Sequence, residues 1–391
     1  MKRTIIAIAI AIVIANLFSS CSKQNKEESM KEISDRVFAL ADSQFKLLAS
    51  QLEDGEFPIS VEPGDTLDKY TVEAWTSGFF PGSLWLTYEQ TGDEEVKKLA
   101  ERFTRQMSTL LDHDTDHDLG FQVNCSYGNA YRITGDSLYL PMMVNAAKRL
   151  SERFNPVVGC TRSWNHGEWE YPVIMDNMMN LELLLSVGNI VDSIDYTDVA
   201  KTHADTTIKN HFREDFSTWH LVNYSAKDGH VINKQTVQGF SDDSMWARGE
   251  AWALYGYTMM YRFTGEERYL KQACSVADLL LKRLPEDGIP YWDFDCDKIP
   301  DTYRDASAAC IMASAFVELS QMASKPEYRA MAEKQIRTLT SPEYLVAEGE
   351  LHGFLLKHSV GHLPGDSQID VPLTYADYYL LEALRRLTPH A

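Results

Sequence analysis

A six-residue pattern, Tyr-x-x-Thr-Gly followed by an acidic residue, occurs three times and limits the possible folds more than any other feature. The copies occupy residues 88–93, 131–136 and 261–266, and a helix-like run follows each one. Glycine commonly ends a helix, and an acidic residue at the start of the next helix interacts favourably with its dipole. The glycines of the first two copies are 43 residues apart, and those of the last two are 130 residues apart. A period near 43 residues corresponds to one antiparallel helix pair.

Weaker junctions extend this period to about twelve helices in six pairs. The first and last predicted helices, 30–52 and 375–387, are amphipathic and lack neighbours, so they can pair with each other. An open solenoid would need polar caps at its ends, which favours ring closure. We therefore predict an all-α (α/α)6 toroid forming a single catalytic domain over residues 31–391, with an irregular all-α domain as the alternative. The other predicted helices and their junctions cover 173–186, 187–189, 193–211, 304–321, 323–326 and 327–339.

The N-terminus has the pattern of a bacterial lipoprotein signal. Lys2 and Arg3 precede an apolar run over 5–14 that is too short for an ordinary membrane-spanning helix, and small residues precede Cys21. We predict a signal peptide over 1–20, a lipidated Cys21 and a flexible tether over 21–30. This predicts a lipid-anchored protein of the bacterial cell envelope, at the periplasmic or outer-membrane surface. A plain secretory signal with a chance cysteine is the alternative.

The composition argues against several kinds of partner. The formal net charge of −20 disfavours nucleic acid, so an anionic substrate would need arginines placed locally in a cleft. The run of aspartates and histidines over 112–118 lacks the EF-hand pattern, which needs glycine in place of His117 and an acidic residue in place of Val123. No cysteines are spaced as C-x-x-C. We predict no metal and no organic cofactor.

Two aspartates stand out as candidates for catalysis. Asp118 follows His117 in a segment that ends in glycine and phenylalanine, and Asp176 lies within an apolar stretch, 173–179. A charge in apolar surroundings is costly unless it is used or paired. Carboxyl groups can exchange protons, and nearby tryptophans can stack on sugar rings. Carbohydrate chemistry is therefore indicated, although Asp176 could be a helix N-cap and Asp118 a loop residue bonded to its own backbone.

Seven segments taken in order resemble the unsaturated glucuronyl hydrolases, glycoside hydrolase family 88. Any one segment is weakly specific, but together they extend over most of the chain that follows the N-terminal signal. The family has an (α/α)6 barrel, in agreement with the independent argument from the repeat. The segments are 57–58, 75–82, 117–121, 175–180, 238–244, 246–252 and 370–379.

The resemblance implies an unusual reaction. The family removes a 4,5-unsaturated uronic acid from the non-reducing end of lyase-generated glycosaminoglycan oligosaccharides by hydrating the C4=C5 vinyl ether. By motif, Asp176 corresponds to the general acid and base, and Asp118 to a second aspartate that holds the sugar hydroxyls. Burial and a neighbouring carboxylate would raise the pKa of such an acid.

The resemblance also implies substrate-binding residues. His220, Gln238 and Arg248 correspond to residues near the reacting sugar, and Arg248 could pair with the uronate carboxylate or, alternatively, form an ion pair with Asp243 or Glu250. Trp252 lies one helical turn after Arg248 and can face the same cavity. Single tryptophans and histidines are often ordinary core residues. Stacking by Trp75 and Trp164, and sulfate contacts by Lys357, Ser359 and His362, complete the predicted site.

Two other functions remain open from the sequence. One is an unsaturated rhamnogalacturonyl hydrolase acting on pectin fragments on the same barrel. The other is a non-catalytic glycan-binding lipoprotein, which would need the tryptophans and the anchor but would give no reason for two carboxyl groups in apolar surroundings.

Overall fold

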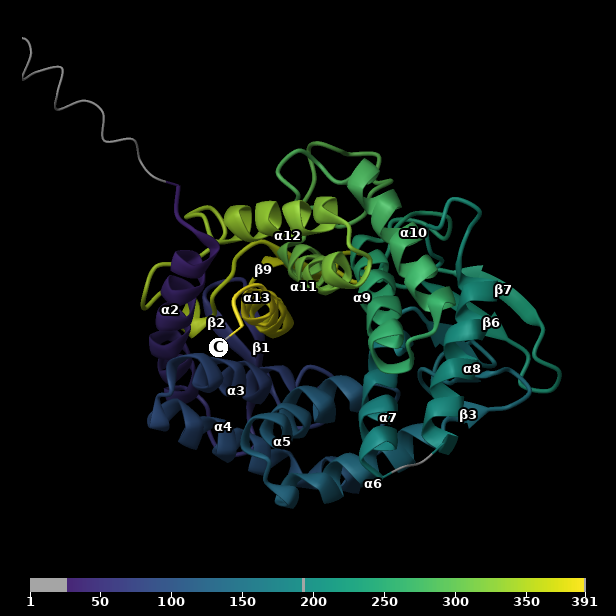
Figure 1. The fold of residues 1–391 in the computed structure, drawn as a ribbon, viewed down its shortest axis with the longest axis horizontal. Helices are drawn as coiled ribbons and strands as arrows, with labels where there is room; N and C mark the ends of the chain where they lie inside the picture. Colours follow the sequence, from purple (N-terminus) through teal and green to yellow (C-terminus); the bar gives the residue numbers. More distant parts are fainter. Residues whose placement is uncertain (1–26, 192–193, 390–391) are drawn as a thin grey trace, which may run out of the picture.

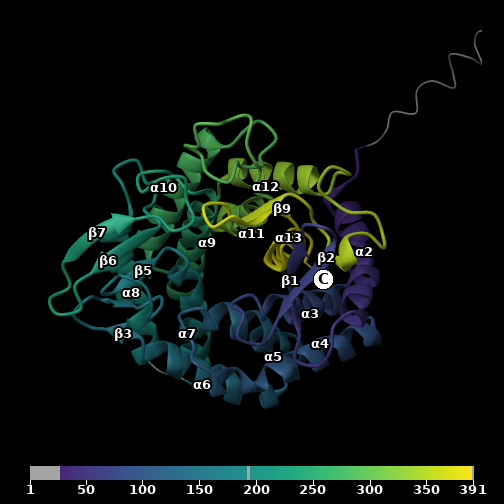
Figure 2. The same cartoon turned by 180° about the vertical axis from the view of Figure 1, so that it is seen from behind.

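The helices form two concentric rings in the computed structural model, which describes residues 27–191 and 194–389 (Figure 1, and from behind Figure 2). The inner ring consists of α3 (Phe79–Thr91), the π-helix η2 (Gly120–Gly128) continued by α5 (Asn129–Thr134), α7 (Asn177–Val191), α9 (Ala247–Thr264), α11 (Ala306–Met322) and α13 (Thr374–Leu387). The outer ring consists of α2 (Met30–Ser50), α4 (Glu94–Gln106), α6 (Leu140–Ser151), α8 (Ile194–His211), α10 (Glu267–Arg283) and α12 (Pro326–Leu339). This arrangement confirms the predicted (α/α)6 toroid.

The two rings differ in which faces of their helices are buried. Nearly every residue of α11 is buried, as expected for an inner helix surrounded by protein. In α4 only Val96, Ala100, Phe103 and Thr104 are buried, at spacings of three or four residues that place them on one face. An amphipathic outer helix therefore seals each section of the apolar inner ring.

The ring closes where the sequence predicted. Helix α13 packs between α11 and α3 in the inner ring and also contacts α2. The Thr388 hydroxyl donates a hydrogen bond to the Ser34 hydroxyl at 2.9 Å, which ties the last helix to the first. Pairing of the two terminal helices is confirmed.

The repeated motifs form the predicted turns. Gly92, Gly135 and Gly265 follow helices with φ of 71°, 69° and 65°, the left-handed conformation that glycine adopts without strain. The Asp93 carboxylate accepts the Glu95 and Val96 N–H groups and so caps α4.

Both predicted boundaries of the helix over 173–186 are wrong. Pro172–Ile174 is strand β5, and α7 begins only at Asn177 and continues to Val191, so the expected junction at 187–189 lies inside a helix. Periodicity cannot distinguish a short buried strand from a buried helix when every residue is apolar. At the N-terminus, the Ser29 hydroxyl accepts the Glu32 N–H and caps α2, which begins at Met30 as predicted for the first helix, so residue 30 belongs to the helix and not to the tether.

Short antiparallel strands connect the helices in the described part of the chain. One sheet joins β5 (Pro172–Ile174), β6 (Leu221–Tyr224) and β7 (Val231–Gln235). The three remaining pairs are β1 (Phe57–Glu62) with β2 (Thr66–Tyr70), β3 (Phe154–Asn155) with β4 (Cys160–Thr161), and β8 (Ser359–His362) with β9 (Ser367–Val371). Short 3-10 turns are η1 (Met107–Asp112), η3 (Ser137–Tyr139) and η4 (Leu351–Gly353).

The predicted signal peptide and Cys21 lie outside the described residues. Within 27–191 and 194–389, no helix combines the length and the apolar character needed to cross a membrane.

Candidate active site

The loops that lead into the inner helices enclose a cavity of about 160 Å³. Seven residues expected from the sequence line it, namely Trp75, Asp118, Trp164, Asp176, His220, Gln238 and Arg248. Asp118 precedes η2, Asp176 precedes α7, and Arg248 is in the first turn of α9. The same end of the helical ring therefore supplies both carboxyl groups and the cation.

Strand pairing brings Asp176 and His220 together. In the β5–β6 ladder Val173 pairs with Val222, and the Met175 N–H donates to the His220 carbonyl oxygen at 3.0 Å. The residues at the edge of this ladder therefore face each other, and His220 Nε2 lies 3.8 Å from Asp176 Oδ2.

The hydrogen bonds around His220 fix its tautomer. The backbone N–H groups of Val237 and Gln238 approach its Nδ1 at 3.2 and 3.3 Å. Nδ1 must therefore accept, and the proton resides on Nε2, which has no partner among the described residues. Burial, with a contribution from Arg248, lowers the pKa of His220 to about 3, so its neutral ring directs an N–H toward the cavity carboxyl.

Asn180 connects the two aspartates. It lies one turn after Asp176 on α7, and its Nδ2 is 3.3 Å from both Asp118 Oδ1 and the Asp176 carbonyl oxygen. Its Oδ1 accepts the Phe121 N–H at 2.9 Å. A Cβ on Gly120 would lie 2.5 Å from the Asn180 Cα, so only glycine allows η2 to approach α7 this closely.

Burial raises the pKa values of both carboxyl groups. The pKa of Asp176 rises to about 6, because loss of solvent outweighs the opposing attraction of Arg248. The pKa of Asp118 is raised well above its usual value by burial and then by the neighbouring Asp116 and Asp176. A carboxyl group with a pKa near 6 can give a proton and take one back close to neutral pH.

Arg248 is held rigidly beside these acids. Its guanidinium donates to the carbonyl oxygens of Val360 and Gly361, to Gln238 Oε1 at 3.2 Å and to Asp305 Oδ2 at 3.4 Å. The alternative ion pairs with Asp243 and Glu250 are not formed, since Asp305 is the carboxylate in contact. Strand β8 and the start of α11 thus position the cation.

A sequence model of Glycosyl Hydrolase Family 88 matches residues 50–391. The chain belongs to this family. It is 42% identical over 372 residues to an unsaturated glucuronyl hydrolase of Formosa agariphila, covering 93% of this chain and 92% of the relative. The crystal structure of an unsaturated glucuronyl hydrolase specific for heparin is 45% identical, with a TM-score of 0.89 over 91% of this chain and 96% of that one. The resemblance, the fold and the assignment as a glycoside hydrolase are confirmed.

A more distant family 88 structure contains a ligand. A mutant unsaturated glucuronyl hydrolase of Streptococcus agalactiae, complexed with dGlcA-GalNAc6S, is 27% identical with a TM-score of 0.79 over 93% of both chains.

Four expected substrate-binding residues are not part of the cavity lining, namely Trp252, Lys357, Ser359 and His362. The His362 Nε2 lies 3.0 Å from the Val237 carbonyl oxygen. Trp252 is fully buried, with its ring centroid 5.1 Å from that of Phe121, and its indole opposes the rise in the Asp176 pKa. Ser359 is fully buried in β8. The Lys357 Nζ donates to the Pro342 carbonyl oxygen at 2.9 Å and lies at a different hollow.

The cavity also contains residues to which the sequence assigned no role. Asp116 and His117 line it, together with Ile174 and Val237. His117 stood in the quoted motif, and its Nε2 lies 3.7 Å from Asp118 Oδ1. The sequence indicates Asp116 only as part of the acidic run over 112–118, which lacks the EF-hand pattern. In the structure its Oδ1 accepts the Asp118 N–H at 2.9 Å. The motif could therefore have identified His117 as a site residue, whereas the hydrogen bond that Asp116 accepts forms only in the folded loop.

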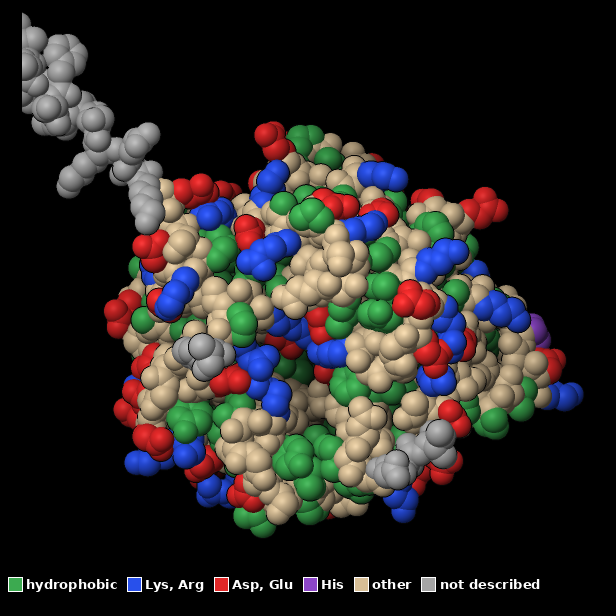
Figure 3. Space-filling view, in the orientation of Figure 1, with side chains coloured by type: hydrophobic (Ala, Val, Ile, Leu, Met, Phe, Trp, Pro, Cys, Tyr) green, Lys and Arg blue, Asp and Glu red, His purple; other side chains and the backbone are tan. Residues whose placement is uncertain are grey.

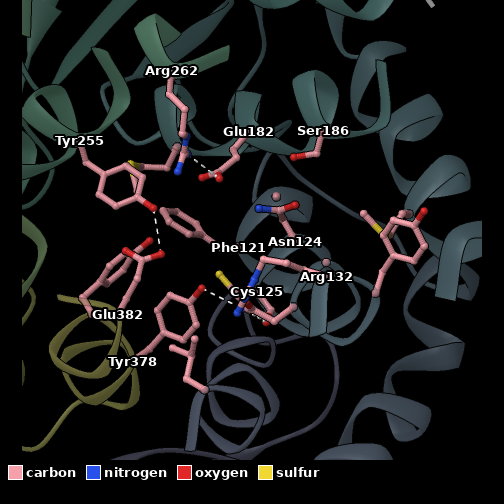
Figure 4. Close-up of a pocket in the computed structure, with 18 of the residues that line it drawn as sticks. Phe121, Asn124, Cys125, Arg132, Glu182, Ser186, Tyr255, Arg262, Tyr378 and Glu382 are labelled. Carbon is pink, nitrogen blue, oxygen red and sulfur yellow. Dashed lines mark hydrogen bonds and ion pairs between the residues drawn. The ribbon is translucent and has the colours of Figure 1, made fainter. Parts of the chain in front are cut away.

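The opposite end of the inner ring has a larger cavity of about 310 Å³. The face seen in Figure 3 is hollowed at its centre, where basic and acidic side chains gather. The close-up in Figure 4 shows Glu182 paired with Arg262, and the Tyr255 hydroxyl donating to Glu382. We name this the base cavity.

Proposed function

We propose that this glycoside hydrolase removes a 4,5-unsaturated uronic acid from the non-reducing end of lyase-generated glycosaminoglycan oligosaccharides. The observation that carries the proposal is the pair of buried carboxyl groups, Asp118 and Asp176, that share one small cavity with neutral histidines. The unsaturated glucuronyl hydrolases to which this chain is similar, one of them specific for heparin, support the same substrate class.

The geometry assigns separate tasks to the residues. Protonated Asp176 gives its proton to C4, water adds at C5, and Asp176 recovers a proton from that water. The resulting hemiketal opens and releases the aglycone, so the net reaction adds one water and needs no further reactant. Asp118, whose pKa burial and two neighbouring carboxyl groups raise, can form a hydrogen bond with a sugar hydroxyl.

The remaining side chains fit an unsaturated uronate. The His220 Nε2–H can orient the attacking water, because it is buried without a partner 3.8 Å from Asp176. Arg248 supplies a fixed positive charge for the uronate carboxylate. Trp75 and Trp164 provide aromatic surfaces at the cavity wall.

A substrate panel tests the proposal. The conjugated C=C–carboxylate chromophore absorbs in the ultraviolet and disappears on hydration, so turnover is followed directly. Unsaturated disaccharides from hyaluronan, chondroitin and heparin lyase digests are the expected substrates. Turnover of pectin-derived fragments alone would favour the rhamnogalacturonyl hydrolase, and binding without turnover of any substrate would favour the glycan-binding lipoprotein.

We further propose that the enzyme is lipid-anchored in the cell envelope through Cys21. The support is the sequence of residues 1–21, with its basic start, apolar run and small residues before the cysteine. Labelling with a radioactive fatty acid and fractionation of cells test it. The native chain should be labelled and recovered with membranes, and Cys21→Ser should lose both properties; equal behaviour of the two would refute the anchor.

A further inference from the structure

A second hollow of about 540 Å³ adjoins the catalytic cavity. Asp116 and Trp164 line both spaces, so the two share a wall. The catalytic cavity, at about 160 Å³, is well below the 300 Å³ or more of typical ligand pockets, so it suits one sugar ring. The rest of a bound oligosaccharide needs an exit, and this hollow begins where the catalytic cavity ends. We name it the Arg149 groove.

Aromatic rings form the boundary between the two spaces. The Trp164 and His166 rings stack with centroids 5.7 Å apart and planes 24° apart, and Trp169 packs edge-on against Trp164 at 5.5 Å. The Trp164 Nε1 is buried and has no hydrogen-bond partner among the described residues. A flat ring with an unused donor at this position suits a sugar that passes out of the cavity.

The groove contains two arginines without carboxylate partners. Neither Arg149 nor Arg153 forms an ion pair with any residue in 27–191 or 194–389, although the whole chain carries a net charge of −20. Arg153 instead donates to the carbonyl oxygens of Thr115 and Arg162, at 2.9 and 2.8 Å, which fixes its guanidinium. Arg149 is exposed and makes one bond, to the Leu111 carbonyl oxygen at 3.3 Å.

Acidic residues in the groove do not neutralise these arginines by contact. Asp114 and Glu152 also line the groove, but neither makes an ion pair with Arg149 or Arg153. Asp116 uses its carboxylate for the Asp118 N–H, and burial raises its pKa. Asp116 and Asp118 partly offset the burial that lowers the pKa of Arg153, so the exposed Arg149 is the guanidinium without a matching charge, and its planar donors suit sulfate or carboxylate.

We propose that the Arg149 groove binds the aglycone of the substrate through an anionic group. The group is either a sulfate on the first aglycone sugar or the carboxylate of a uronate further along the chain. This inference rests on the proposed function and adds the residues that would select among its substrates. It is an alternative to the predicted sulfate contact by Lys357, which lines a hollow that shares no residue with the catalytic cavity.

Three substrates separate the two sources of negative charge. They are an unsulfated unsaturated disaccharide, the same disaccharide carrying one sulfate on its hexosamine, and an unsulfated tetrasaccharide with an internal uronate. For Arg149→Gln we expect kcat/KM to fall about fivefold, mainly through KM, for the sulfated disaccharide or the tetrasaccharide. The unsulfated disaccharide should change less than twofold, and added salt should reduce the difference between wild type and variant.

Two variants serve as matched controls. Lys298→Gln removes a cation from a third hollow that shares no lining residue with the catalytic cavity, and Lys357→Gln tests the earlier sulfate assignment. Both should leave all three kcat/KM values within twofold. Thermal melting of each variant verifies that it is folded.

The outcomes distinguish this inference from the proposed function. Absence of turnover of every substrate by the wild type would refute the function. Turnover of the disaccharide with equal effects of Arg149→Gln on all three substrates, or no effect on any, would refute only the groove. A selective loss in Lys357→Gln would return sulfate recognition to the 357–362 segment.

Discussion

The two ends of the inner ring differ in the side chains that lie beside their acidic residues. At the base cavity, Glu182 pairs with Arg262 (Figure 4), with the two side chains 2.7 Å apart. Arg386, which also lines this cavity, lies 3.1 Å from Glu318. At the catalytic cavity, the nearest basic group to Asp176 is the neutral ring of His220, and Asp118 faces His117, whose pKa burial lowers. The acids at the base have arginine partners, although burial still raises the pKa of Glu182, whereas Asp118 and Asp176 have no arginine within ion-pair distance among the described residues.

Helix direction accounts for part of this difference. Arg132, Arg262 and Arg386 lie in the last turns of inner helices, where a positive charge offsets the negative end of the helix dipole. The catalytic residues lie where these helices begin. The one arginine in the lining of that cavity, Arg248, directs its donors to carbonyl oxygens, Gln238 and Asp305 instead of the catalytic acids.

The largest expected effect follows from removing the carboxyl group of Asp176, the proposed proton donor. Asp176→Asn should lower kcat by about 10³-fold or more, because the variant cannot protonate carbon. Substrate should still bind, as measured by calorimetry. Glu182→Gln at the base cavity is the matched control and should keep kcat within threefold in folded protein. Wild-type turnover by Asp176→Asn would remove it from the mechanism.

The next effect concerns stability at the base. Arg386→Gln removes the contact to Glu318 and a hydrogen bond to the Tyr255 hydroxyl at 2.8 Å. It leaves buried carboxylates without their cation, which should cost about 3–5 kcal/mol of unfolding free energy. Denaturant titration measures this loss. The comparison between the ends would fail if kcat of the folded variant fell while stability stayed unchanged.

At the catalytic end, a substitution should raise stability instead of lowering it. Because the pKa of Asp176 is about 6 in the folded protein, against 3.8 for an ordinary aspartate, its ionisation opposes folding. The cost is absent below pH 4, grows as pH rises toward 6, and reaches about 3 kcal/mol above it. Asp176→Asn should therefore raise the melting temperature near pH 7.5 and leave it unchanged near pH 4. A variant less stable than wild type at the higher pH would contradict the assigned shift.

Asn180 should give the smallest of these effects. Asn180→Ala removes the amide between Asp118 and Asp176, and kcat should fall roughly ten- to a hundredfold with KM little changed. Asn180→Asp keeps an acceptor for the Phe121 N–H but adds a further carboxyl group beside Asp118, so its pH profile should shift as well. Asn124→Ala, at the base cavity, is the control. Equal kinetics for Asn180→Ala and wild type would limit Asn180 to packing.

The sequence predicted the barrel because its signals are local. A glycine after each helix and an acidic residue before the next are recognisable without tertiary contacts, and Gly92, Gly135 and Gly265 all adopt the expected conformation. Strand β5 was missed because a three-residue apolar strand that leads into a buried helix has no periodicity of its own. The register that places His220 opposite Asp176 was therefore not predictable.

The family motifs identified most of the site residues, and physical arguments from the sequence identified only some of them. The apolar neighbours of Asp176 correctly indicated a carboxyl with a raised pKa. The contact between Arg248 and Asp305 joins residues 57 positions apart, and the bond to the Val360 carbonyl oxygen spans 112. Such contacts exist only in the closed ring, so the spacing in the sequence suggested Asp243 and Glu250, which do not form the ion pair with Arg248.

The most direct test of the central claim is the pH dependence of kcat/KM for the native enzyme on an unsaturated disaccharide. This profile reports the groups of the free enzyme. With Asp176 as the proton donor, kcat/KM should fall as pH rises through about 6, with the slope of a single ionisation. A value that stays constant or increases between pH 5 and 8 would contradict Asp176 as the catalytic acid.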